Sequence, residues 1–117
     1  QNYVIILYMR RKFTQMREDA TEYPLVTYNK LSKSRQEIFT FLMQNRNSNN
    51  EQQVANQEIS DRMDKHAQHI SSGMKAIIKL DMARRGEYNL VMINPNMWFS
   101  GDIPAHNRAV QKWESLQ

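Results

Sequence analysis

Residues 67–79, AQHISSGMKAIIK, restrict the fold of this chain more than any other segment. At about 100° per residue, Ile70, Met74 and Ile77 fall in one narrow sector of a helix. Ala67 lies beside them. The opposite sector carries amides, hydroxyls and amines but no carboxylate: Gln68, Ser71, Ser72, Lys75 and Lys79. The pattern predicts a helix with one side packed inward and the other side free.

Two more helices are predicted before this segment. Residues 34–37, SRQE, have the form of a capping box, and the apolar residues behind them predict a helix over residues 34–45. Residues 44–53, QNRNSNNEQQ, are expected to form a polar linker. A further apolar pair one turn apart predicts a short helix over residues 56–64, with Asn56 as its N-cap.

A two-stranded hairpin is predicted after the third helix. Residues 82–85 and 88–93 have the composition of strands, with Gly86 in the turn between them. Arg84 and Arg85 precede this turn, where basic residues commonly contact phosphate groups. A solvated turn is the alternative.

The second strand of this hairpin ends abruptly, in residues 91–102, VMINPNMWFSGD. Pro95 cannot donate a hydrogen bond to a strand ladder, and Asn94 can close the turn locally. We expect Trp98 and Phe99 to plug the base of the helical core rather than to stack on bases.

The N-terminal part is predicted to be a β extension over residues 1–30. Residues 3–9, YVIILYM, indicate a strand, residues 10–19 a charged connector, and residues 23–28, YPLVTY, a second extended piece. The apolar run at 3–9 is too short to span a bilayer and lacks the flanks of a secretory signal, so no membrane partner is expected.

A C-terminal helix is predicted over residues 102–117. Asp102 is its N-cap, and Pro104 lies in the first turn, where a missing N–H costs nothing. This helix carries an apolar stripe that fits either a second copy of the chain or the chain's own helices. Val110, Trp113 and Gln117 lie on one side of this helix, and Ala109 and Leu116 widen the stripe.

Composition narrows the choice of partner. A formal net charge of +4 and a pI near 9.5 favour an acidic partner, with nucleic acid first and a membrane surface second. The absence of cysteine excludes disulfides and fits a reducing, cytoplasmic setting. The chain begins at Gln1 rather than at methionine, so we expect a fragment or a processed product.

The predicted order of helices and hairpin indicates an α+β fold, a winged helix-turn-helix over residues 31–101. In such a domain the third helix lies in the major groove of double-stranded DNA and the hairpin, or wing, contacts the backbone. Gln68 could then read adenine, and the lysines and arginines could release counterions from phosphates. The candidate DNA-binding residues are Gln68, His69, Ser71, Ser72, Lys75, Lys79, Arg84 and Arg85.

The stretch ISSGMKAIIKLDMARRGEYNLVMINPNMWFSGD resembles the end of the winged-helix domain of RepL-type plasmid replication proteins. The resemblance covers about residues 31–102 and rests on three motifs, namely Met92-Ile93-Asn94-Pro95, Met97-Trp98-Phe99 and Gly101-Asp102. It implies DNA binding at a replication origin, with host replication proteins and a second copy of the chain as candidate partners. A transcriptional or copy-number regulator, and a winged helix that binds only proteins, are the alternatives.

The sequence gives little support for a metal site, a cofactor or catalysis. His66 and His69 have neither a nearby carboxylate nor an evident further ligand, so we expect no metal site. A carboxylate cluster is discounted because such residues usually only solvate a helix surface: Glu58, Asp61 and Asp64. No phosphate loop or nucleophile motif appears, and we therefore expect neither an enzyme nor a cofactor.

Overall fold

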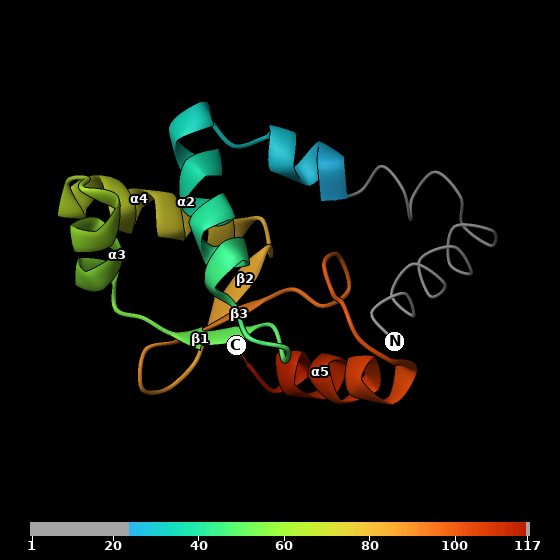
Figure 1. The fold of residues 1–117 in the computed structure, drawn as a ribbon. Helices are drawn as coiled ribbons and strands as arrows, with labels where there is room; N and C mark the ends of the chain where they lie inside the picture. The colour runs from blue at the N-terminus through green and yellow to red at the C-terminus, as the bar shows by residue number, and fades with distance from the viewer. Residues whose placement is uncertain (1–23, 117) are drawn as a thin grey trace.

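The structure is a computed structural model that describes residues 24–116; residues 1–23 and 117 lie outside this range. Helices and short strands are interspersed along it (Figure 1), in the α+β class that the sequence predicts. The order of elements is compatible with a winged helix. The elements are α2 (Lys33–Asn45), β1 (Glu51–Gln53), α3 (Asn56–Met63), α4 (Ala67–Lys79), β2 (Ala83–Arg85), β3 (Leu90–Ile93) and α5 (Ile103–Ser115).

The three strands form one antiparallel sheet in the order β1-β3-β2, so β3 lies in the centre. Because successive side chains of a strand point to opposite faces, Val91 and Ile93 face one side of the sheet and Met92 the other. All three are buried. The continuous apolar sequence of β3 thus reflects a strand that is covered on both faces.

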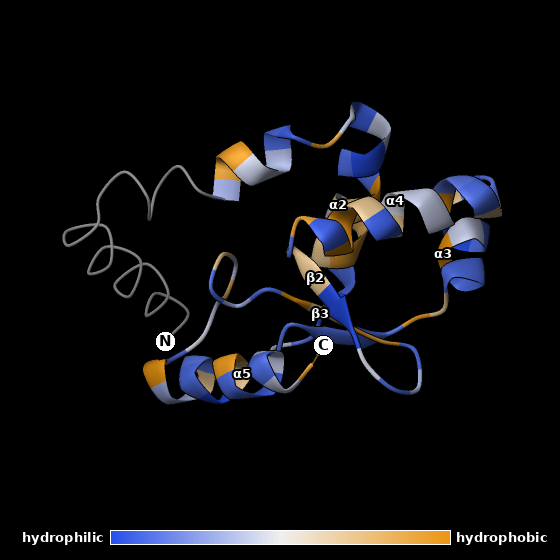
Figure 2. Cartoon of the chain, turned by 180° about the vertical axis from the view of Figure 1, so that it is seen from behind, coloured by the Kyte–Doolittle hydropathy of each residue, from blue (hydrophilic) through white to orange (hydrophobic). Residues whose placement is uncertain are grey.

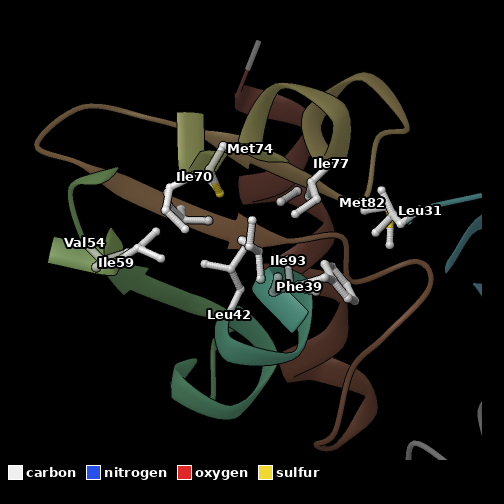
Figure 3. Packing of buried hydrophobic residues seen from close by; sticks show 13 residues of the cluster. Leu31, Phe39, Leu42, Val54, Ile59, Ile70, Met74, Ile77, Met82 and Ile93 are labelled. Atoms are coloured by element: carbon white, nitrogen blue, oxygen red, sulfur yellow. The ribbon is translucent and has the colours of Figure 1, made fainter. Parts of the chain in front are cut away.

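Helices α2, α3 and α4 cover the first face and form the main core (Figure 3). Ile70 and Ile77 are fully buried there and Met74 nearly so, which confirms the predicted inward side of α4. Ala67 is exposed, contrary to the prediction, because it is the first residue of α4 and precedes the packed turns.

The opposite face of the sheet is covered by α5 (Figure 1), which decides between the two alternatives for its apolar stripe. Ala109 and Trp113 pack with Met92 and Phe99 in a second cluster. The helix thus folds back onto its own chain, onto the sheet rather than the helices. Figure 2 shows the matching alternation of hydrophobic and hydrophilic bands along α5. Asp102 is the N-cap as predicted, accepting a hydrogen bond from the Ala105 amide at 2.8 Å.

The turn between α3 and α4 is tight and is closed by its own backbone. Asp64 adopts a left-handed conformation with φ of 54°, and its amide bonds to the Asp61 carbonyl. The Lys65 amide reaches the Ser60 carbonyl at 3.0 Å, which completes a Schellman motif. The Ser60 hydroxyl also donates to the Lys65 carbonyl. These bonds fix the direction in which α4 leaves α3.

The N-terminal boundaries of two helices were predicted wrongly. Ser34 lies inside α2, whose N-cap is Ser32, and Glu37 forms an ion pair with Lys65 at 3.1 Å instead of closing a capping box. Asn56 is the first residue of α3 rather than its cap. In both places a tertiary contact takes the side chain that local capping would have used.

The prediction of an extended segment over residues 23–28 is wrong, since residues 24–29 are helical. The β-branched and aromatic residues that suggested a strand make up one turn and a half of helix instead. The predicted strand over residues 3–9, the connector over 10–19 and most of the β extension over 1–30 lie outside the described residues.

The predicted linker over residues 44–53 contains strand β1, which the sequence did not indicate. Asn50 anchors it: its buried side-chain amide donates to the Ile93 carbonyl at 3.0 Å and to the Trp98 carbonyl. With φ of 66°, Asn50 occupies the left-handed region, which asparagine tolerates better than most residues. A polar residue in a polar run therefore fixes the edge of the sheet.

The aromatic residues after β3 divide between the two cores. Trp98 packs on Phe39 with ring centroids 4.8 Å apart, which confirms its predicted place at the base of the helices. Phe99 instead faces α5. Asn94 closes the turn as predicted, because its side-chain oxygen accepts the Asn96 amide at 2.9 Å.

Candidate nucleic-acid interface

The outward side of α4 forms an open polar surface. Gln68, Ser72, Lys75 and Lys79 are exposed, and Ser71 is partly buried beside them. Within residues 24–116, neither lysine has an ion pair or a hydrogen bond to protein. Residues three or four apart on a helix are neighbours, so these side chains form one continuous strip. The strip has two unpaired cations and no carboxylate.

Arg35 of α2 reaches this strip from the side. Its Nη2 donates to the Ser72 hydroxyl at 2.8 Å. The approach is possible because Gly73 lies at the crossing of the two helices, where a Cβ atom would stand 2.5 Å from Ile38 Cδ1. Sequence reasoning considered Arg35 only as part of a capping box. Its contact with Ser72 of α4 was missed, because the two residues are distant in the chain.

The neighbouring helix α3 has a different charge pattern. Its exposed side carries Glu58 and Asp61, and Asp64 follows its end. Glu58 pairs with Arg62 at 3.5 Å, and Asp61 accepts from Gln57 at 3.0 Å. Carboxylates and their local partners therefore occupy α3, whereas Lys75 and Lys79 on α4 have no partner within residues 24–116.

Arg84 lies on β2, and its guanidinium group is directed into the protein. It donates to the Trp113 and Leu116 carbonyls at 2.9 and 3.1 Å, at the end of α5. It also pairs with Asp81 at 3.1 Å and lies 4.2 Å from the centre of the Trp113 ring. We expected a phosphate contact here. The observed contacts instead close the C-terminus of α5, where a cation is favourable.

Arg85 is also engaged within the chain. Its guanidinium group donates to the Val54 carbonyl at 3.0 Å, to the Asn89 carbonyl at 3.3 Å and to the Asn56 side chain. Burial lowers the pKa of Arg85 from its ordinary value, because desolvation disfavours the charged form. The Arg85 guanidinium group therefore links the β2–β3 hairpin to the start of α3, instead of standing free as the prediction of a phosphate contact assumed.

The β2–β3 hairpin, the predicted wing, has a tight turn over residues 87–90. Tyr88 and Asn89 have φ of 58° and 60°, and the Leu90 amide bonds to the Glu87 carbonyl at 3.2 Å, the pattern of a type I′ turn. The Tyr88 side chain is 83% exposed. The tip therefore presents an aromatic ring and a carboxylate rather than the predicted arginines.

His69 borders the open strip, whereas His106 lies away from it on α5. His69 is partly buried on the flank of α4, and no described residue forms a hydrogen bond with its enclosed Nε2. His106 is a buried residue of α5 itself, and its Nε2 lies 2.8 Å from the Pro95 carbonyl. Among the described residues, no group of three or more His, Asp or Glu side chains is arranged to hold a metal ion.

Comparison with known proteins gives one match. The model of the RepL family, described as Firmicute plasmid replication protein, matches residues 25–117. No curated protein and no solved structure matches the chain. The matched range includes every labelled helix and strand from α2 to α5, together with the open strip of α4, and it extends the predicted resemblance at both ends. The chain therefore belongs to the RepL family of Firmicute plasmid replication proteins.

Proposed function

We propose that this chain binds double-stranded DNA sequence-specifically through a winged helix of residues 31–101, and that it acts in the initiation of plasmid replication at an origin. The observation that carries the proposal is the exposed side of α4, which is cationic and free of carboxylates. Membership of a plasmid replication family supports the role in replication.

In this proposal α4 enters the major groove while α3 supports it from behind. The Gln68 amide pairs with the N6 and N7 atoms of an adenine, and Ser71 and Ser72 bond to base edges or phosphates. Lys75 and Lys79 contact phosphates, and His69 flanks them. Arg84 and Arg85 act indirectly by holding the wing and α5 in place.

Base reading by Gln68 has a direct test in the Gln68→Ala variant. Preference at one base position should relax, at a cost of about 1–3 kcal/mol in the preferred site, while non-specific affinity stays nearly constant. Binding to a library of duplexes measures this. Gln111→Ala is the matched control, because Gln111 is also an exposed amide and lies on α5, beyond the sheet. Retention of preference at every position would contradict the register proposed for α4.

The role in replication is tested in cells. A plasmid that carries the DNA flanking this gene should replicate when the gene is supplied and fail without it. Replication without the gene, together with altered transcription, would favour a copy-number regulator. Footprinting on the same DNA should reveal the bound site; paired half-sites would support a homodimer, and added host replication proteins should extend the footprint.

A further inference from the structure

We propose that Arg35 of α2 is part of the DNA-binding surface and contacts a phosphate beside Ser72. This inference rests on the proposed function and adds a residue from a helix that does not enter the groove. Its guanidinium group has a single hydrogen bond within the described residues, to the Ser72 hydroxyl at 2.8 Å. Arginine has five N–H donors, so most of the fork remains available for an anion.

The position of this group is fixed by the crossing of α2 and α4. Ile38 is fully buried and its Cδ1 occupies the space that a side chain at residue 73 would need. The same missing side chain lies 3.6 Å from Arg35 Cγ. Gly73 thus lets α2 approach α4 closely enough for Arg35 to reach its exposed strip. This explains a glycine in the middle of a helix, where it otherwise costs stability.

The surroundings favour an anion at this place. Ser72 is a neighbour of Gln68 and Lys75 on α4, so Arg35 extends the cationic strip sideways. The nearest carboxylate in the sequence of α2, Glu37, is paired with Lys65 at 3.1 Å. An arginine fork matches phosphate oxygens in a bidentate manner, which a lysine cannot do. The ligand class assigned to this group is therefore a DNA backbone phosphate.

The test uses the full chain and a duplex of mixed sequence at several salt concentrations. Arg35→Ala should reduce the slope of log affinity against log salt by about 0.9, equivalent to roughly a fivefold loss of affinity at 0.15 M salt. Arg35→Lys should keep the slope and still lose affinity, because the charge remains and the fork is lost. Arg108→Ala removes the same charge from α5, on the other side of the sheet, and should change neither quantity.

A second pair of variants tests the close approach of the helices without altering charge. Gly73→Ala should displace Ile38 and Arg35 and weaken binding, and the added substitution Ile38→Val should restore it by removing the atom that obstructs the new methyl group. Unchanged binding by Arg35→Ala and by Gly73→Ala would overturn the inference. A wild-type chain that binds duplex without salt dependence would instead overturn the proposed function.

Discussion

The cations of α4 and those of β2 carry the same formal charge and differ in their surroundings. Lys75 and Lys79 are exposed and have no partner in the described part of the chain. Arg84 and Arg85 are partly buried, and each bridges distant elements through several hydrogen bonds. The difference separates charges that can meet a ligand from charges that hold the fold. Only the first kind should appear in the salt dependence of DNA binding.

The largest effect that follows from this difference is expected at Arg84. Arg84→Ala removes the cap of α5, the pair with Asp81 and the contact with Trp113. We expect the free energy of unfolding to fall by about 2–4 kcal/mol, because two part-buried carbonyls and the Asp81 carboxylate lose their donor and the Trp113 ring loses its packing partner. Urea denaturation measures this. A variant with wild-type stability and a shallower salt slope would show that Arg84 acts on DNA after all.

Removal of the two lysines should weaken DNA binding and leave stability nearly unchanged, which is the reverse of the effect expected at Arg84. The double variant Lys75→Ala with Lys79→Ala should reduce the salt slope by about 0.9 for each residue, or roughly 30-fold in affinity at 0.15 M salt. Stability should change by less than about 0.5 kcal/mol, since neither side chain has a partner within residues 24–116. Fluorescence titration with duplex DNA measures the slope. An unchanged slope would remove both lysines from the interface.

Arg85 should give a smaller loss of stability than Arg84. Arg85→Ala should cost about 1–2 kcal/mol, because the Val54 carbonyl and the Asn56 side chain lose a common donor. Arg85→Lys should recover only part of this loss, since a single ammonium group cannot span both acceptors. Thermal unfolding of the two variants makes the comparison. Full recovery of stability in Arg85→Lys would show that the positive charge at this position matters and that the shape of the guanidinium group does not.

The smallest effect is expected at the tip of the wing. Tyr88→Ala removes an exposed ring and should change stability by less than about 0.5 kcal/mol. The salt slope should be unchanged, because the side chain carries no charge. A fall in affinity at constant slope would identify a stacking or sugar contact by the ring. A change in the salt slope would contradict the proposal that the phosphate contacts come from α4 and not from the β2–β3 hairpin.

The sequence predicts the part of the fold that follows from local periodicity. The helix over residues 67–79 has the predicted bounds, because its apolar residues recur at helical spacing over three turns. Strand β1 was missed because Glu51–Gln53 has no apolar alternation, and its pairing is decided by the backbone of β3. Residues 24–29 have the composition of a strand and are nevertheless helical.

The same holds for the candidate site: the part that depends on helical periodicity was predictable from the sequence. The side of α4 that faces outward follows from the helical period, so four exposed residues of the strip were identified in advance. The sequence could not show that Arg84 and Arg85 are engaged within the protein, because their partners, Trp113 and Val54, lie about thirty residues away in the chain. The contact of Arg35 with Ser72 depends on the same kind of long-range packing.

The most direct measurement uses the absence of cysteine from this chain, since one introduced thiol then reports one position. Ser72→Cys and Ser115→Cys place a thiol at exposed serines on α4 and on α5. Saturating duplex DNA should strongly slow the alkylation of the thiol at position 72 and leave the rate at position 115 unchanged. Equal rates at position 72 with and without bound DNA would contradict the assignment of α4 as the DNA-binding surface.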